Sequence, residues 1–209
     1  MDVSLIELHF LPSLEYFCAL QRSNEILIER HERFVKQSYR NRCYIQTTQR
    51  IEMLSVPLTA KHHQALFRDI RVDNSRKWSA IMWRTIMSAY RNSPFYEHYA
   101  DDLQALLSRE YTFIYDLDMA LLSFCLKSLH WQKKISETTS FNEPAQDGVQ
   151  DFRNLIADRT GFATRGLYRP VKYYQVFGSE FGENLSIIDL LFCQGPEARN
   201  ILVKSGVPN

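Results

Sequence analysis

The position of its glycines restricts the fold of this 209-residue chain more than any other feature, because all seven lie at position 148 or later. Dinucleotide-binding folds and P-loops need glycine in the turn between a strand and the following helix. Only a backbone without a side chain lets phosphate approach the amides closely there. Gly178 and Gly182 match neither spacing. The sequence therefore excludes NAD-linked redox chemistry and P-loop ATP chemistry, and it indicates no cofactor.

Composition predicts one domain spanning residues 1–209. With 45% apolar residues, the chain is long enough to bury one core and short for two. No stretch of about 18 consecutive apolar residues is present, and Asp2 and Glu7 stand where a secretory signal would need basic residues. We expect a cytoplasmic protein without a metal, because its cysteines are scattered and lack metal-ligand spacing: Cys18, Cys43, Cys125 and Cys193.

The N-terminal part predicts a strand–helix–strand unit. An apolar run at residues 6–11 is followed by Pro12 and Ser13, which favour the start of a helix over residues 14–20. Residues 25–29 predict a short buried strand. Later strand-like runs predict a hairpin and one more strand, at residues 42–47, 51–58 and 69–72.

A block of helices follows. Apolar residues at helical spacing predict helices beginning after Ser75, after Ser93 and near Phe113. The remaining segments predict a loop, a strand and a closing helix at residues 136–148, 173–177 and 184–192. The fold class is therefore α/β: a mixed sheet with an N-terminal βαβ unit, a central helical block and a short C-terminal strand–helix return.

The segment from His31 to Arg42 is the strongest candidate for a functional site. Between Arg30 and Arg50 the chain carries six bases and one acid. Ligands of open α/β sheets bind outside the carboxyl ends of the strands, and this segment follows the second strand. We expect an anionic substrate, held by Lys36, Ser38, Arg40, Asn41 and Arg42. A solvated surface loop explains the same composition about equally well.

His31 is the candidate catalytic base, because imidazole titrates near neutral pH. Most histidines are not catalytic, and only the neighbours of this one favour such a role. If Arg40 binds the substrate, Arg40→Ala should abolish binding and leave the melting temperature of the unliganded protein nearly unchanged.

A second basic stripe is predicted on the helix after Ser75. Lys77, Arg84 and Arg91 recur every seven residues, with Ser88 between the last two. Arg84 and Ser88 are therefore candidate substrate contacts, although a solvated helix face explains the stripe about as well.

Other polar residues are weighed individually. Gln175 is a further candidate contact, whereas Asn184 and Ser186 suit helix capping better. His62 and His63 are adjacent and cannot share one face, so they indicate a surface loop rather than a metal site.

An acidic stretch from Glu97 to Asp118 balances the basic segment. It holds six acids and one base, Arg109. A partner protein is expected to use this face if the chain is an adaptor. The acids are Glu97, Asp101, Asp102, Glu110, Asp116 and Asp118.

Four ordered blocks read HERFVKQSYRNRCYI, LSVPL, W…WRTIMSAYRNSPFY and YYQVFGSEF…NLSIIDLLFCQGPEA. These blocks resemble the WbqC-like family of bacterial proteins, and the resemblance extends over roughly residues 9–200. The resemblance implies a cytoplasmic bacterial protein whose relatives are named from O-antigen and other surface-polysaccharide gene clusters, and it favours a role for Arg84. Many relatives carry Asp where the second strand ends, whereas this chain has Glu29 and His31, which puts an acid role at that position in doubt.

Three functions follow from these features. The first is a group-transfer enzyme of surface-polysaccharide assembly that moves a small acyl or aminoacyl group to a nucleotide-linked sugar. The second is a non-catalytic ligand-binding or adaptor protein that uses the same basic pocket or the acidic face. The third is a single-strand nucleic-acid binder, since bases interleave with Phe34, Tyr39 and Tyr44. It ranks last because the formal net charge is only +1.

Overall fold

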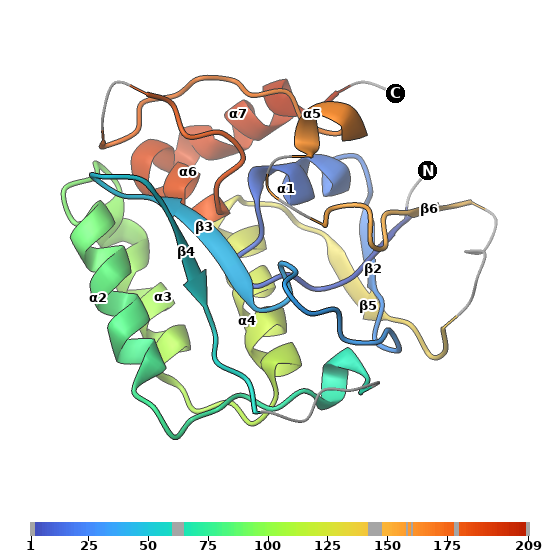
Figure 1. Ribbon diagram of the computed structural model, residues 1–209. Coiled ribbons are helices and arrows are strands. Elements are labelled where there is room, and N and C mark those ends of the chain that lie inside the picture. Colours follow the sequence, from blue (N-terminus) through green and yellow to red (C-terminus); the bar gives the residue numbers. More distant parts are fainter. Residues whose placement is uncertain are drawn as a thin grey trace.

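A parallel sheet and a separate antiparallel hairpin organise the protein. The computed structural model describes residues 3–59, 65–141, 148–157, 159, 161–177 and 180–207. The predicted α/β class is confirmed, but the parallel and antiparallel pairs form two sheets rather than one mixed sheet. Figure 1 shows the parallel strands on one side, the hairpin in the middle, and helices on the far side and along one end.

The N-terminal βαβ unit is confirmed. Strand β1 (Val3–Ile6) pairs in parallel with β2 (Glu25–Ile28), and α1 (Leu14–Leu20) connects them. The first strand ends earlier than the predicted residues 6–11. After Ile6 the chain is irregular and buried, and the positive φ of Leu11, 41°, breaks the extended conformation before Pro12.

Two short strands complete the parallel sheet, in the order β5-β2-β1-β6. Strand β5 (Lys134–Glu137) pairs with β2, and β6 (Val149–Asp151) pairs with β1. The predicted loop at residues 136–148 is therefore wrong at its first two residues, which belong to β5, whereas β6 begins directly after Gly148; residues 142–147 lie outside the described part. Both strands are sheet edges with few apolar residues, which explains why the sequence did not predict them as strands.

The predicted hairpin is confirmed as β3 (Arg42–Gln46) and β4 (Ile51–Ser55), which pair with Tyr44 opposite Met53. The additional strand predicted at residues 69–72 is wrong. A short 3-10 helix, η1 (Phe67–Asp69), occupies its start, and only single bridges follow, from Val72 to Leu58 and from Arg71 to Phe113.

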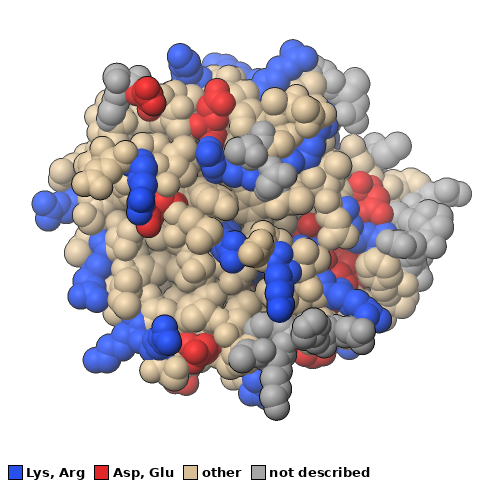
Figure 2. Space-filling model, viewed as in Figure 1, with Lys and Arg blue, Asp and Glu red and all other residues tan. Residues whose placement is uncertain are grey.

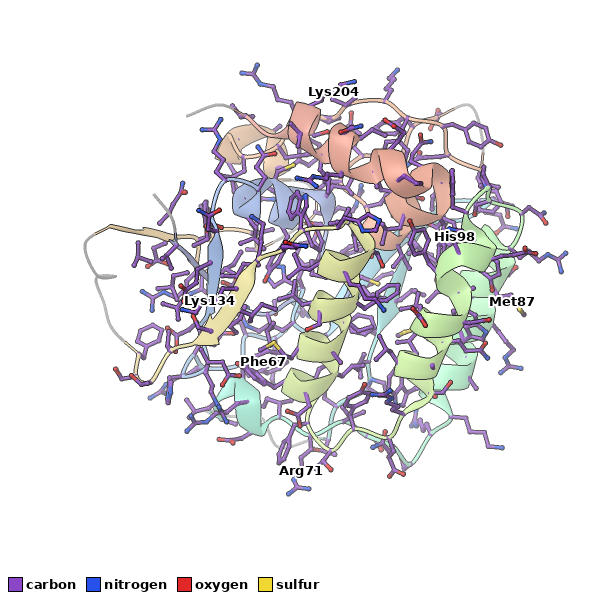
Figure 3. All side chains as sticks on the ribbon, turned by 180° about the vertical axis from the view of Figure 1, so that it is seen from behind. Phe67, Arg71, Met87, His98, Lys134 and Lys204 are labelled. Atoms are coloured by element: carbon purple, nitrogen blue, oxygen red, sulfur yellow. The ribbon has the colours of Figure 1, made fainter. Side chains whose placement is uncertain are left out.

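The central helical block consists of α2 (Trp78–Tyr90), α3 (Tyr96–Ser108) and α4 (Ile114–Ser128). Their apolar stripes are buried, as the helical spacing predicts. Seen from behind, α4 lies between α3 and the parallel sheet (Figure 3). Phe67 of η1 contacts Tyr115 near the start of α4, with their ring centroids 5.9 Å apart.

The C-terminal return contains helices but not the expected strand. After the short helix α5 (Phe162–Arg165), residues 173–177 run without strand pairing. The closing helix is confirmed as α6 (Ile187–Gln194), and the chain then continues through η2 (Gly195–Glu197) into α7 (Ala198–Ser205), which the sequence did not predict. Side-chain hydrogen bonds from residues 173–175 to Asp189 replace the expected strand pairing.

No helix among the described residues is long and apolar enough to cross a membrane. His62 and His63 lie outside the described residues.

Candidate functional site

The four parallel strands place polar side chains along their carboxyl edge. Glu7 follows β1, Glu29 follows β2, Thr138 follows β5 and Asp151 ends β6. The carboxyl edge is where open α/β sheets bind ligands. Seven ionisable residues meet at this edge, and we call them the strand-end cluster: Glu7, His9, Glu29, Glu32, Arg40, Asp151 and Arg153.

Arg40 is buried within this cluster, with only 3% of its surface exposed. Its Nε donates to Glu32 Oε1 at 2.8 Å, and its Nη2 donates to the other carboxylate oxygen of Glu32. Nη2 also donates to Asn154 Oδ1 at 3.0 Å and lies 3.7 Å from Glu7 Oε1. A sequence-predicted ligand-binding arginine is thus engaged by the protein itself, which favours an anchoring role.

Arg153 makes the corresponding connection on the other side of the edge. Its Nη1 donates to Glu29 Oε2 at 2.8 Å, and its Nη2 donates to Asp151 Oδ2 at 2.7 Å. Glu29 Oε1 accepts from the backbone amide of His31 at 2.8 Å and from the Thr138 hydroxyl at 2.7 Å. The ends of β2, β5 and β6 are therefore joined by one carboxylate.

Glu7 and His9 form a buried pair on the loop after β1. Glu7 Oε1 lies 3.4 Å from His9 Nε2, and both residues are 1% exposed. Burial opposes ionisation of Glu7, but the hydrogen bond with His9 and the charge of Arg40 help to outweigh it, and the pKa of Glu7 is lowered. Burial also lowers the pKa of His9. A neutral imidazole held by a carboxylate follows.

Glu32 is the cluster member suited to proton transfer near neutral pH. Burial raises its pKa to about 7, Arg40 opposes the shift, and the charges of Glu7 and Glu29 add to it. A carboxyl group poised in this range can take up and release a proton under physiological conditions.

His31, the predicted base, lies at the partly exposed rim of the cluster. Its Nε2 lies 3.1 Å from the backbone oxygen of Thr138, and Arg68 Nη1 lies 3.2 Å from its Nδ1. Both ring nitrogens of His31 thus face protein groups. This arrangement favours a role for His31 in orienting Arg68 over a role in accepting a proton from the substrate.

The other predicted residues of this segment divide into two groups. Ser38 donates to the backbone oxygen of Val35 at 2.7 Å and Asn41 Nδ2 to that of Val56 at 3.0 Å, so both shape the loop. Lys36 is exposed, and the buried Nε of Arg42 has no hydrogen-bond partner among the described residues. Lys36 and Arg42 are therefore the two with donors to offer a ligand.

Arg84 and Ser88 belong to a different surface. Both are exposed on α2 and line a shallow groove against Thr47 and Thr48 of the β3–β4 turn. In Figure 1 helix α2 lies across the molecule from the ends of β2 and β5. The structure does not bring these residues together with the strand-end cluster.

Gln175 is buried in a polar network around Asp189. Its Nε2 donates to Asp189 Oδ1 at 2.9 Å, beside the hydroxyls of Tyr173 at 2.6 Å and Tyr90 at 2.7 Å, which bind the same carboxylate. Gln175 Oε1 also accepts from the amide of Gly182 at 2.8 Å. The network joins α2, α6 and the C-terminal segment, so it has a structural explanation.

The two expected capping residues act differently. Asn184 Oδ1 accepts from the backbone amide of Glu15, at 3.0 Å, so it caps α1 rather than its own helix. Ser186 occupies the N-cap position of α6, but its hydroxyl donates to the backbone oxygen of Leu11 at 2.8 Å.

The acidic stretch is exposed on α3 and at the start of α4, except for Asp118, which is fully buried. Burial raises the pKa of Asp118 well above its usual value. Among the described residues, no group of three or more His, Cys, Asp or Glu side chains is arranged so that it could hold a metal ion. Burial also raises the thiol pKa of Cys43, which opposes a role as nucleophile.

Sequence reasoning missed most of the strand-end cluster, above all Glu7, His9 and Arg153. One signal was present: Glu7 and His9 interrupt an apolar run directly after a strand. Arg153 follows a strand that the sequence did not predict, so its position at the sheet edge was hidden.

Comparison with known proteins adds the family. The model of the WbqC-like protein family matches residues 8–166, which is more than half of the chain and includes every member of the strand-end cluster except Glu7. "Uncharacterized protein Rv1507c" of Mycobacterium tuberculosis is 25% identical over 229 residues, which cover 96% of each chain. No solved structure matches significantly. The block around Gln175 lies outside the matched range.

Proposed function

The chain belongs to the WbqC-like protein family, and we propose that it is a group-transfer enzyme of cell-surface polysaccharide biosynthesis acting on an anionic, nucleotide-linked sugar. The transferred group is a small acyl or aminoacyl group. One observation carries the proposal: buried ionisable side chains gather at the ligand-binding edge of the parallel sheet. Burial raises the pKa of one of them, Glu32, to about 7, which suits it to proton transfer.

Glu32 supplies the chemistry that such a transfer needs. The oxygen or nitrogen of the acceptor sugar loses a proton as it bonds to the acyl carbon, and the leaving group of the activated donor gains one. A carboxyl group with a pKa near neutrality can accept the first proton and return it to the leaving group. Arg40 holds this carboxylate in place through two hydrogen bonds.

Basic side chains at the rim would hold the anionic part of the substrate. Lys36 is exposed, Arg68 is partly exposed beside His31, and Arg42 Nε has no partner in the part of the chain that the structure describes. Figure 2 shows Lys and Arg side chains around the centre of the face on which these loops lie. In this proposal His31 orients Arg68 and Glu32 moves the proton.

A non-catalytic binding protein is the second candidate, because Arg40 already neutralises Glu32 within the protein. The same rim would then hold a ligand without turnover. Alternatively, the exposed acids of α3 would dock a basic partner protein.

Ligand stabilisation tests the proposal first. The melting temperature of the protein is measured with nucleotide sugars, acyl-CoA, aminoacyl donors and oligonucleotides, because a ligand well above its Kd raises stability. We expect a nucleotide sugar to raise it. A panel in which no small molecule does so overturns the proposal, and a shift by oligonucleotides alone favours nucleic-acid binding.

A measurement of turnover then distinguishes a group-transfer enzyme from a non-catalytic binding protein. Sugars that bind are incubated with donors and the products weighed by mass spectrometry. We expect Glu32→Gln to keep binding and to lower the rate by about 10²–10⁴-fold, while the exposed control Glu97→Gln leaves it unchanged. Equal rates for the wild type and Glu32→Gln would refute the role of Glu32.

A further inference from the structure

Three buried polar atoms near the end of β1 have no hydrogen-bond partner among the described residues: His9 Nδ1, Ser13 Oγ and Tyr39 Oη. The side chains that carry them are at most 3% exposed. Folded proteins satisfy the great majority of buried polar groups, and exceptions often mark a missing ligand or water. Three exceptions in one neighbourhood therefore point to a partner that the protein itself does not supply.

These atoms lie on segments that contact one another. The His9 and Tyr39 rings stack, with centroids 5.3 Å apart and an interplanar angle of 21°. Tyr39 meets Tyr44 edge to face at 5.9 Å. The backbones of Ser13 and Ser186 pair in an isolated antiparallel β-bridge, and the backbone amide of Ser186 donates to the backbone oxygen of Tyr44 at 2.8 Å.

Identical residue types in the same neighbourhood do find partners. The Tyr16 hydroxyl donates to the backbone oxygen of Glu7 at 3.0 Å, and the Ser186 hydroxyl donates to that of Leu11 at 2.8 Å. Tyr16 also contacts the His9 ring, with centroids 4.9 Å apart. Among the described residues, Ser13 and Tyr39 thus differ from Ser186 and Tyr16, which are of the same residue types and do find partners.

Aromatic and basic side chains connect the buried atoms with the surface. Tyr44 is half-buried, and the guanidinium of Arg159 lies 5.8 Å from its ring centroid. Arg42 stands two residues before Tyr44 on β3 and so shares its face of the strand. Arg159 thus places positive charge against the ring, and Arg42 carries positive charge on the same face of β3.

We propose that His9, Ser13, Tyr39 and Tyr44 form the binding site for a hydroxylated sugar ring, with its phosphate beside Arg42 and Arg159. This inference rests on the proposed function and names the residues that hold the sugar. The site lies next to the strand-end cluster, because His9 binds Glu7 and Glu7 lies 3.7 Å from Arg40.

The chemistry of the three atoms selects a hydroxylated ligand. An ionised Glu7 accepts the proton on His9 Nε2, which leaves Nδ1 as an acceptor. The Ser13 and Tyr39 hydroxyls each donate and accept. Sugar hydroxyls also donate and accept, and they project from several sides of the ring, so one ring can satisfy all three atoms. The ring would reach them past Tyr44, and the phosphate would remain near the arginines.

Single-atom deletions test the site. Tyr39→Phe and Ser13→Ala each remove one unpartnered oxygen, whereas the matched controls Tyr16→Phe and Ser186→Ala each remove a partnered one. Urea unfolding of the unliganded proteins should show an unchanged or higher midpoint for the two test variants and a lower midpoint for both controls.

Calorimetric titration with UDP-glucose, glucose 1-phosphate and inorganic phosphate measures binding. We expect the test variants to lose about tenfold or more in affinity for the bound sugar phosphate, and the folded controls to stay within about threefold of the wild type. Loss of inorganic phosphate binding by a test variant to the same degree would refute contact with the sugar.

The two proposals fail differently. If the wild type binds none of the sugar probes and no other nucleotide sugar, the proposed function fails and the site with it. If the wild type binds a sugar phosphate and the test variants bind it equally well, only the site is refuted. Test variants that unfold as easily as the controls would show that their hydroxyls are partnered in solution, which also overturns the site.

Discussion

Replacing Arg40 with alanine should destabilise the unliganded protein severely, contrary to what the sequence alone predicts. Arg40 and Glu32 are 3% and 4% exposed, and their ion pair uses two hydrogen bonds. Arg40→Ala leaves the buried carboxylates of Glu32 and Glu7 without their counter-charge. Breaking one side of a buried ion pair costs about 3–5 kcal/mol. In a domain of this size that corresponds to a fall in melting temperature of roughly 6–20 °C.

Urea unfolding at pH 8 and at pH 5.5 measures the free energy of unfolding of Arg40→Ala against the wild type. The folded-state pKa of Glu32, about 7, exceeds its ordinary value of 4.5. Between these values the folded state binds more protons than the unfolded one, so the contribution of Glu32 to stability rises as the pH falls from about 7 towards 4.5. The cost of Arg40→Ala should therefore be smaller at pH 5.5, where Glu32 is protonated.

Arg33→Ala is the matched control, because Arg33 is an exposed arginine of the same segment. Its effect should stay within about 0.5 kcal/mol. An Arg40→Ala protein as stable as Arg33→Ala would refute the anchoring role and return Arg40 to the substrate contacts. If Arg40→Ala lowers the free energy of unfolding by the same large amount at both pH values, the destabilisation does not come from leaving the Glu32 carboxylate without its counter-charge.

Three further predictions concern other parts of the structure. Asp118→Leu should raise the free energy of unfolding by about 1–3 kcal/mol, because neither carboxylate oxygen has a hydrogen-bond partner among the described residues; a urea titration that shows a loss contradicts this. Asn184→Ala should lower it by about 1–2 kcal/mol and speed hydrogen exchange of the Glu15 amide, which Asn184 caps. Arg84→Ala should change the free energy of unfolding by no more than about 0.5 kcal/mol and should leave the rise in melting temperature with a nucleotide sugar unchanged; loss of that rise would place the substrate in the α2 groove.

The helices and the βαβ unit follow from the sequence because local periodicity determines them. Trp78, Met82, Ile86 and Ala89 recur at helical spacing and are all buried on α2. The edge strands β5 and β6 cannot be predicted from local periodicity. Their sequences, KISE and VQD, carry one apolar residue each, and their pairing with β2 and β1 depends on contacts more than a hundred residues away.

The position of the site was predictable, but the residues that compose it were largely not. Strand order places residues 31–42 beside the carboxyl edge, and the structure agrees. Arg153, however, binds Glu29 across 124 residues of chain, and Asn154 binds Arg40 across 114. Pairings over such separations leave no local pattern.

Charge in the basic segment therefore overstates its capacity to bind anions. Arg40 is neutralised by Glu32, and Arg30 pairs with Glu137, so each contributes to the scaffold rather than to a ligand. Tyr39 and Arg42 come from the same segment and keep polar atoms without a partner among the described residues, but nothing in the local sequence distinguishes them from their neighbours. Buried polar atoms without a partner among the described residues can bind a ligand without first giving up a hydrogen bond to the protein, which is why they point to a binding surface more directly than the total charge of the segment does.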